Sequence, residues 1–138
     1  MSLCFLSLET SKVFNKSILK NLEENRFYGL SEALIVLFPY ISESKKITSS
    51  QLSKKVGYSR QAIHKNIKKL IEYEYITLNL ENEKEKNIQL TPKGNSLVKC
   101  ANEYIETVEK EIASLIGNKE LDIYKKTQNQ IYEHLQSK

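Results

Sequence analysis

The 138-residue sequence is poor in the side chains from which enzymatic and metal sites are built. It has two cysteines, two histidines and one aspartate, and Cys4 and Cys100 lie far apart in the chain. Such spacing fits neither a disulfide framework nor a set of metal ligands. The sequence also offers no nucleophile paired with a base. We therefore expect a protein that is not an enzyme and holds no metal or cofactor.

Long hydrophobic runs are lacking as well. The longest apolar stretch, residues 33–41, is too short to cross a bilayer. The opening residues, MSLCFLSLETSK, place no positive charge before the apolar side chains, unlike a signal peptide. These two features predict a cytoplasmic protein without a membrane partner.

Glycine and proline are scarce, with four and two copies, so the chain has few breaks and should be mainly helical. Ser31 is a candidate N-cap, and Pro39 should kink or end the buried helix that follows it. Gly117 should end a long helix, and Asn118 can cap the next one. Periodicity predicts helices over residues 8–24, 33–38, 49–56, 60–72, 95–116 and from 118 onward.

Two of these helices are separated by little more than Gly57 and Tyr58, which is the spacing of a helix-turn-helix. Thr48 and Gln51 form a capping-box pattern before the first helix, and Ser59 can cap the second. Alternating apolar residues then predict a hairpin, with strands in YITLNL and NIQLT joined by a charged connector. The expected fold class is mainly α with a small β-hairpin wing: a winged helix-turn-helix plus a helical dimerisation region.

Positive charge is concentrated in residues 45–71, which contain eight lysines or arginines and no acid. Because the whole chain carries +4, the remainder carries −4. A segment of +8 suits a polyanionic partner. The alternative is a solvated lysine face with no partner.

The second helix of the pair has two different faces. If Ile63 points to the core, Ile67 and Leu70 lie beside it, while His64 and Lys68 lie on the opposite side. A helix of this kind fits the DNA major groove, with its first turn at the base edges and its lysines at phosphates. We therefore predict base contacts by Ser59, Arg60, Gln61 and His64, and backbone contacts by Lys54, Lys55, Tyr58, Lys65, Lys68 and Lys84. Two alternatives stay open: Tyr58 simply packs the turn, and His64 is simply exposed.

The C-terminal helices carry a longer apolar stripe than a small winged domain can cover. The stripe includes Leu97, Val108, Leu121 and Leu135. A second copy of the chain is the simplest partner for it. The alternative is that these helices fold back on their own domain.

The order of parts resembles the MarR family of bacterial transcription regulators over nearly the whole chain. The segments that carry the resemblance are GLSEALIVLFPYI, ITSSQLSKKVGYSRQAIHKNIKKLIEYEYI, LTPKG and GNKELDIYKKTQNQIYEHL. The resemblance implies one MarR-like domain over 1–138, with dimerisation helices at 1–28 and 95–138 and a DNA-binding lobe at 29–94. It also implies a homodimer on a palindromic operator in double-stranded DNA, and a pocket for a small-molecule ligand.

The chain departs from the family pattern at two places. The usual Asp-x-Arg of the wing is replaced by Asn82-Glu83-Lys84, of which Lys84 can still contact the minor groove or a phosphate. Glu74 stands where a glycine usually follows the second helix.

The opening LCFLSLETSK resembles the organic-hydroperoxide sensors of the same family, which implies that Cys4 is a redox-sensor candidate. The sensors also use two tyrosines to activate the thiol; the first of these positions is Ile18 here, and the second falls near Glu32, with Tyr28 as the nearest tyrosine. Cys4 as a small apolar residue in a dimer interface is the alternative.

The function predicted from these features is that of a dimeric, sequence-specific DNA-binding transcription regulator. The family resemblance favours a repressor that a small molecule or an oxidant releases from DNA. The alternative is a winged-helix module that docks to an acidic protein and does not bind DNA specifically.

Overall fold

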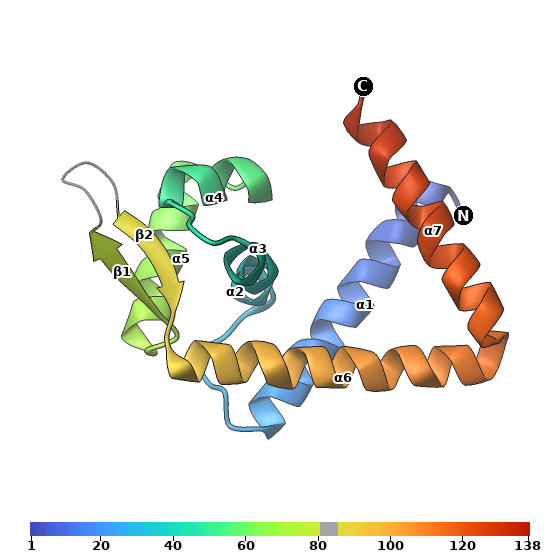
Figure 1. Cartoon of the computed structure of the whole chain (residues 1–138), viewed down its shortest axis with the longest axis horizontal. Coiled ribbons are helices and arrows are strands. Elements are labelled where there is room, and N and C mark those ends of the chain that lie inside the picture. The colour runs from blue at the N-terminus through green and yellow to red at the C-terminus, as the bar shows by residue number, and fades with distance from the viewer. Residues whose placement is uncertain (81–85) are drawn as a thin grey trace. The chain divides into compact units, whose positions relative to one another are not determined.

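The structure is a computed structural model that describes residues 1–80 and 86–138 (Figure 1). The elements in chain order are α1 (Leu3–Glu24), α2 (Glu32–Ile35), α3 (Leu37–Glu43), α4 (Ser49–Val56), α5 (Arg60–Glu72), β1 (Ile76–Leu80), β2 (Lys86–Leu90), α6 (Pro92–Ile116) and α7 (Asn118–Gln136). The predicted fold class, mainly helical with a two-stranded wing, is confirmed. The chain forms two compact units, residues 1–102 and 103–138. None of the helices in the described ranges has the length and apolar character needed to span a membrane.

Two helices begin at N-caps that the sequence did not predict. α1 begins before the predicted Leu8, because the Ser2 hydroxyl accepts a hydrogen bond from the N–H of Phe5 at 3.0 Å. The N-cap of α7 is Gly117, with φ of 98°, and the predicted cap Asn118 is the first helical residue instead. The expected end of the preceding helix at Gly117 is confirmed.

The long helix α6 also begins earlier than the predicted Asn95. Thr91 caps it, since its hydroxyl accepts a hydrogen bond from the N–H of Gly94 at 3.0 Å. Pro92 is the first helical residue, a position that needs no N–H and suits the fixed φ of proline. The LTPKG segment therefore runs from Leu90, the last residue of β2, directly into the first turn of α6.

The apolar segment after Ser31 forms two short helices instead of one. The predicted cap is confirmed, because the Ser31 hydroxyl accepts from the N–H of Leu34 at 3.2 Å. The break falls at Val36, ahead of Pro39, which itself lies in the first turn of α3. A proline ring clashes with the carbonyl four residues before it, here that of Ile35, so the helix is interrupted before the proline.

The core of the first unit is built around Tyr75, which is fully buried. Its ring meets Phe38 edge to face, with centroids 5.9 Å apart, and its hydroxyl donates to the Tyr28 carbonyl at 2.7 Å. Burial, and secondarily Tyr73, raises the pKa of the Tyr75 hydroxyl, which stays a neutral donor. The other buried apolar side chains are Leu22, Leu34, Ile35, Leu37, Phe38, Ile41, Ile47, Leu52, Ile63, Ile67, Leu70, Ile76, Ile88 and Leu97.

The wing is an antiparallel pair in which Ile76 lies opposite Leu90 and Leu78 opposite Ile88. The sequence did not predict a further contact in the middle of β2, where the N–H of Ile88 donates to the Ile47 carbonyl at 2.8 Å. The predicted alternation buries only Ile76 and Ile88 fully. Leu78 is half-exposed because the hairpin extends beyond the core.

The last turn of α5 ends with a non-glycine residue in the left-handed region. Glu74 has φ of 65°. Its N–H donates to Ile71 O at 2.9 Å, and that of Tyr75 donates to Leu70 O at 2.9 Å. These two bonds form a Schellman motif, in which glycine is the usual residue at this position. The departure from the family pattern at Glu74 therefore falls where the backbone favours glycine.

We predict that Glu74→Gly stabilises the fold by about 0.5–1 kcal/mol. Removing the left-handed strain gains roughly 1–2 kcal/mol, and the added freedom of the unfolded glycine offsets part of this gain. The midpoint of urea denaturation at fixed protein concentration should rise. Gly57→Ala is the matched control, since Gly57 has φ of 84° and open space around its missing Cβ. That control should lower the midpoint, and a lower midpoint for Glu74→Gly would contradict the prediction.

Candidate nucleic-acid interface

The helix-turn-helix is held by caps at the start of both of its helices. Thr48 and Gln51 exchange two hydrogen bonds, Thr48 N–H to Gln51 Oε1 at 3.0 Å and Gln51 N–H to Thr48 Oγ1 at 3.2 Å. The predicted capping box is thus confirmed. Gly57 ends α4 in the left-handed region, and the Ser59 hydroxyl accepts from the N–H of Ala62 at 3.1 Å. These residues set where the first turn of α5 begins.

The turn itself is closed by a hydrogen bond that the sequence did not predict. The Ser53 hydroxyl, which is buried, donates to the Tyr58 carbonyl at 2.7 Å. The Tyr58 ring is half-buried against the core, and its hydroxyl lies 3.5 Å from the Ala33 carbonyl. This arrangement favours the packing role of Tyr58, while its contact with a phosphate stays a prediction.

The two faces of α5 are disposed as the sequence predicted. Ile63, Ile67 and Leu70 are 1%, 5% and 1% exposed. Gln61, His64, Lys65 and Lys68 are all exposed. The burial of three side chains at helical spacing fixes the rotation of α5 about its axis. The polar and basic side chains must therefore face solvent.

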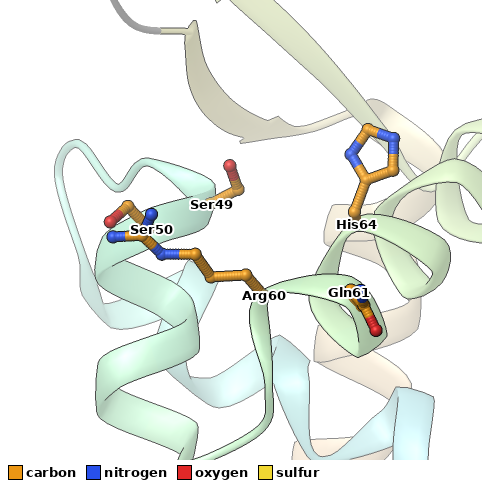
Figure 2. Close-up of a pocket in the computed structure, with 5 residues that line it drawn as sticks. All are labelled: Ser49, Ser50, Arg60, Gln61 and His64. Atoms are coloured by element: carbon orange, nitrogen blue, oxygen red, sulfur yellow. The ribbon is translucent and has the colours of Figure 1, made fainter.

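A shallow hollow of about 410 Å³ lies between the first turns of α4 and α5. It is lined by Ser49, Ser50, Arg60, Gln61 and His64. Figure 2 shows the Arg60 side chain extending from the start of α5 toward α4, while Gln61 and His64 project from α5 in other directions. Three of the four predicted base-contacting residues therefore share one surface. The fourth, Ser59, is exposed but its hydroxyl is used as the α5 cap.

The serines of this hollow were missed by the sequence interpretation. Ser49 and Ser50 form the first turn of α4, directly after the Thr48 cap. Their position after a capping residue was a usable signal, because the first turn of a helix leaves N–H groups and small side chains at the surface. They add hydroxyl groups beside the cation of Arg60.

Exposed lysines of α4 and α5 lie around this hollow. Lys54 and Lys55 lie in the last turn of α4, and Lys65 and Lys68 lie on α5; all four are exposed. Within residues 1–80 and 86–138, these four lysines form no ion pair. The surface offers guanidinium, amide, imidazole and hydroxyl groups for hydrogen bonds, and no carboxylate from residue 45 to residue 71.

Comparison with known proteins agrees with this geometry. Residues 40–77 match the family model described as winged helix-turn-helix DNA-binding, which covers α4, α5 and the start of the wing. A search of curated protein sequences found no significant match.

Solved structures extend the likeness to the whole chain. Staphylococcus aureus MarR in complex with salicylate and kanamycin is 22% identical with a TM-score of 0.75, over 99% of this chain and 89% of that one. The Staphylococcus aureus MepR–DNA complex is 16% identical with a TM-score of 0.77, over 98% of each chain. A MarR family protein from Bacillus stearothermophilus is 15% identical with a TM-score of 0.76, over 97% and 91%.

The chain has the fold of the MarR regulators. The resemblance inferred from the ordered sequence segments is therefore confirmed at the level of the fold. Within the MarR-like fold, α4 and α5 are the helix-turn-helix and β1 and β2 are the wing. The predicted separation into dimerisation helices and a DNA-binding lobe concerns the assembly, and it stays a prediction.

Two further predicted site residues lie apart from α4 and α5. Lys84, the predicted wing contact, falls in residues 81–85, outside the described residues. Cys4 lies in the first turn of α1 and is exposed. Cys100 instead donates from its thiol to Asn21 Oδ1 at 3.7 Å and is half-buried.

We predict that Ser53→Ala destabilises the MarR-like fold by about 1–2 kcal/mol, because it leaves the Tyr58 carbonyl without its partner in a part-buried turn. Thermal unfolding followed by circular dichroism measures the loss. Ser49→Ala is the matched control, because Ser49 is exposed on the same helix. Equal unfolding temperatures for the two variants would show that the bond across the turn contributes nothing.

Proposed function

We propose that this chain is a dimeric, sequence-specific DNA-binding transcription regulator. The observation that carries the proposal is the exposed face of α5, which is basic, carries no carboxylate before Glu72 in the last turn, and lies opposite a fully buried apolar face. Phosphate is repelled by carboxylates and attracted by lysine and arginine, so this face suits a duplex. The match of residues 40–77 to a DNA-binding winged helix-turn-helix supports the same conclusion.

The side chains divide into two roles on this surface. Arg60 and Gln61 begin α5, and in the major groove Arg60 would offer two parallel donors to guanine and Gln61 would pair with adenine. Ser59 and His64 are the remaining base contacts that we propose. Lys54, Lys55, Lys65, Lys68, Tyr58 and Lys84 are the proposed contacts to the sugar–phosphate backbone, which position the protein without reading sequence.

Uncovered apolar side chains support assembly into a homodimer. On α1 they are Leu3, Phe5, Leu6, Leu8 and Val13, and on α7 they are Ile123, Tyr124, Tyr132 and Leu135. Apolar stripes on helices of this length are usually buried by another helix, and a second copy is the simplest source. A two-fold dimer would present two copies of α5, so the proposed operator is palindromic.

We further propose that the chain represses transcription while it is bound to DNA. A small molecule or an oxidant would release it. The similar Staphylococcus aureus MarR is described in complex with salicylate and kanamycin. A similar chain, MepR, is described as a transcription regulator of a multidrug efflux pump. Cys4 is the residue that we propose for an oxidant response, because its thiol is exposed on α1.

The direct test is fluorescence anisotropy with two labelled duplexes. One is the duplex that the wild-type chain selects best from a randomised pool, and the other is a scramble of it. Tight binding to the first, weak binding to the scramble and a steep loss of affinity with salt are expected. A folded dimer that binds neither duplex at physiological salt would overturn the proposal and favour a protein-docking module.

Arg60→Ala should relax specificity at one base pair, with a loss of about 1–3 kcal/mol on the selected duplex. The reason is that a bidentate contact to one guanine disappears, while duplexes altered at that pair lose little. The measurement is the affinity ratio across a set of single-base variants of the duplex. A uniform loss on selected and scrambled DNA would assign Arg60 to the phosphates instead.

Lys68→Ala should weaken binding to every duplex alike and flatten the slope of log affinity against log salt by about one unit. Loss of one phosphate contact retains one more counterion on the DNA, which is the origin of the change in slope. Lys99→Ala is the control, because Lys99 is an exposed lysine outside the basic segment. An unchanged slope in Lys68→Ala would remove Lys68 from the proposed contacts.

A further inference from the structure

The C-terminal end of α5 is bound to the first turn of α6 through three consecutive carbonyl groups. Lys93 Nζ donates to the Tyr73 carbonyl at 2.8 Å. The Thr91 hydroxyl donates to the Glu74 carbonyl at 2.6 Å, and the Thr91 N–H donates to the Tyr75 carbonyl at 3.0 Å. Residues 73–75 directly follow α5, so three hydrogen bonds hold the exit of this helix to the start of another.

Close packing leaves this junction little freedom to slide. A Cβ added to Gly94 would lie 2.1 Å from the Tyr75 carbonyl oxygen, so the backbone of α6 rests directly on residue 75. On the other side, a Cβ added to Gly29 would lie 2.5 Å from the Tyr73 ring. The Tyr75 hydroxyl also donates to the Tyr28 carbonyl at 2.7 Å. Residues 73–75 are therefore held between the segment after α1 and the start of α6.

The ammonium group of Lys93 makes two contacts in this junction. Its ammonium is 4.6 Å from the centroid of the buried Tyr75 ring while it donates to the Tyr73 carbonyl. Tyr73 is the C-cap of α5, where a positive charge is favoured by the helix dipole. A ring face and a carbonyl oxygen both attract the same cation, so the ammonium is directed at the end of α5.

We propose that Lys93 is a positioning residue for DNA recognition: it acts through the α5 exit and does not contact DNA. This inference rests on the proposed function, because Arg60 and Gln61 must reach base edges from the other end of the same helix. Recognition tolerates errors of only about 0.5 Å or 10–20° in the placement of such side chains. A rigid helix transmits a shift of its C-terminal end to its first turn. Loss of the Lys93 cation should therefore weaken sequence reading more than general DNA attraction.

The test compares Lys93→Met with Lys99→Met, at a temperature well below the unfolding transition of either variant. Both substitutions remove one positive charge from an exposed position on α6 and keep an unbranched apolar stem, but Lys99 forms none of the junction bonds. Affinities for the selected and scrambled duplexes are measured by anisotropy at several salt concentrations. Lys93→Arg, which restores a cationic donor, is the rescue variant.

Lys93→Met should lower the selected-to-scrambled affinity ratio by about three- to tenfold relative to Lys99→Met, because only part of the roughly tenfold or larger effect of one charged hydrogen bond reaches the first turn of α5. The salt slopes of the two variants should be equal, and Lys93→Arg should recover most of the ratio. A flatter salt slope in Lys93→Met than in Lys99→Met would show a direct phosphate contact and overturn the inference. Equal ratios in the two methionine variants would overturn it as well.

Amide hydrogen exchange tests the junction without DNA, so failure of the proposed function can be told apart from failure of this inference. The N–H groups of Glu74 and Tyr75 close the end of α5 on Ile71 O and Leu70 O. Their exchange should accelerate about three- to tenfold in Lys93→Met and stay at the wild-type rate in Lys99→Met. Unchanged exchange in Lys93→Met would mean that the cation does not fix the exit of α5, even if the wild-type chain reads DNA.

Discussion

The burial of Ile63, Ile67 and Leu70 is the constraint on which the rest of the interface depends. Each side chain contributes about 1.5–3 kcal/mol when removed from water, so rotating α5 about its axis would be costly. Because of that constraint the basic face, which has no carboxylate before Glu72, is directed toward solvent. The lysines and arginine of α5 are therefore exposed, where they can contact the phosphates of DNA.

Rotation alone does not place a helix; its two ends must also be fixed. At the N-terminal end, the Ser59 cap and the Ser53–Tyr58 bond define the turn after α4. At the C-terminal end, residues 73–75 are bound by the first turn of α6 and packed against the segment that follows α1. Residues 73–75, which follow α5, therefore contact two segments that lie far apart in the sequence. A displacement of the first turn of α6 would therefore also displace α5, the helix that carries Arg60.

Local patterns in the sequence predicted much of this fold, and contacts between distant segments were not predicted. The faces of α5, the Thr48–Gln51 capping box and the paired strands follow from periodicity and from side chains three residues apart. The bonds from Lys93 and Thr91 to residues 73–75 and the Ile88–Ile47 bond join residues whose proximity only the folded chain creates. The early starts of α1 and α6 were missed because the capping residues Ser2 and Thr91 precede the apolar repeats. For the hollow, the sequence identified the residues on α5 but not the serines on α4.

An NMR titration of the labelled chain with the duplex that it selects best would show directly whether α5 reads DNA. Backbone amide shifts report which residues meet the DNA. We predict that the largest changes fall in residues 49–50 and 59–68, with small changes on α7. A titration that shifts α7 and leaves the first turn of α5 unchanged would contradict the assignment of α5 as the DNA-reading helix.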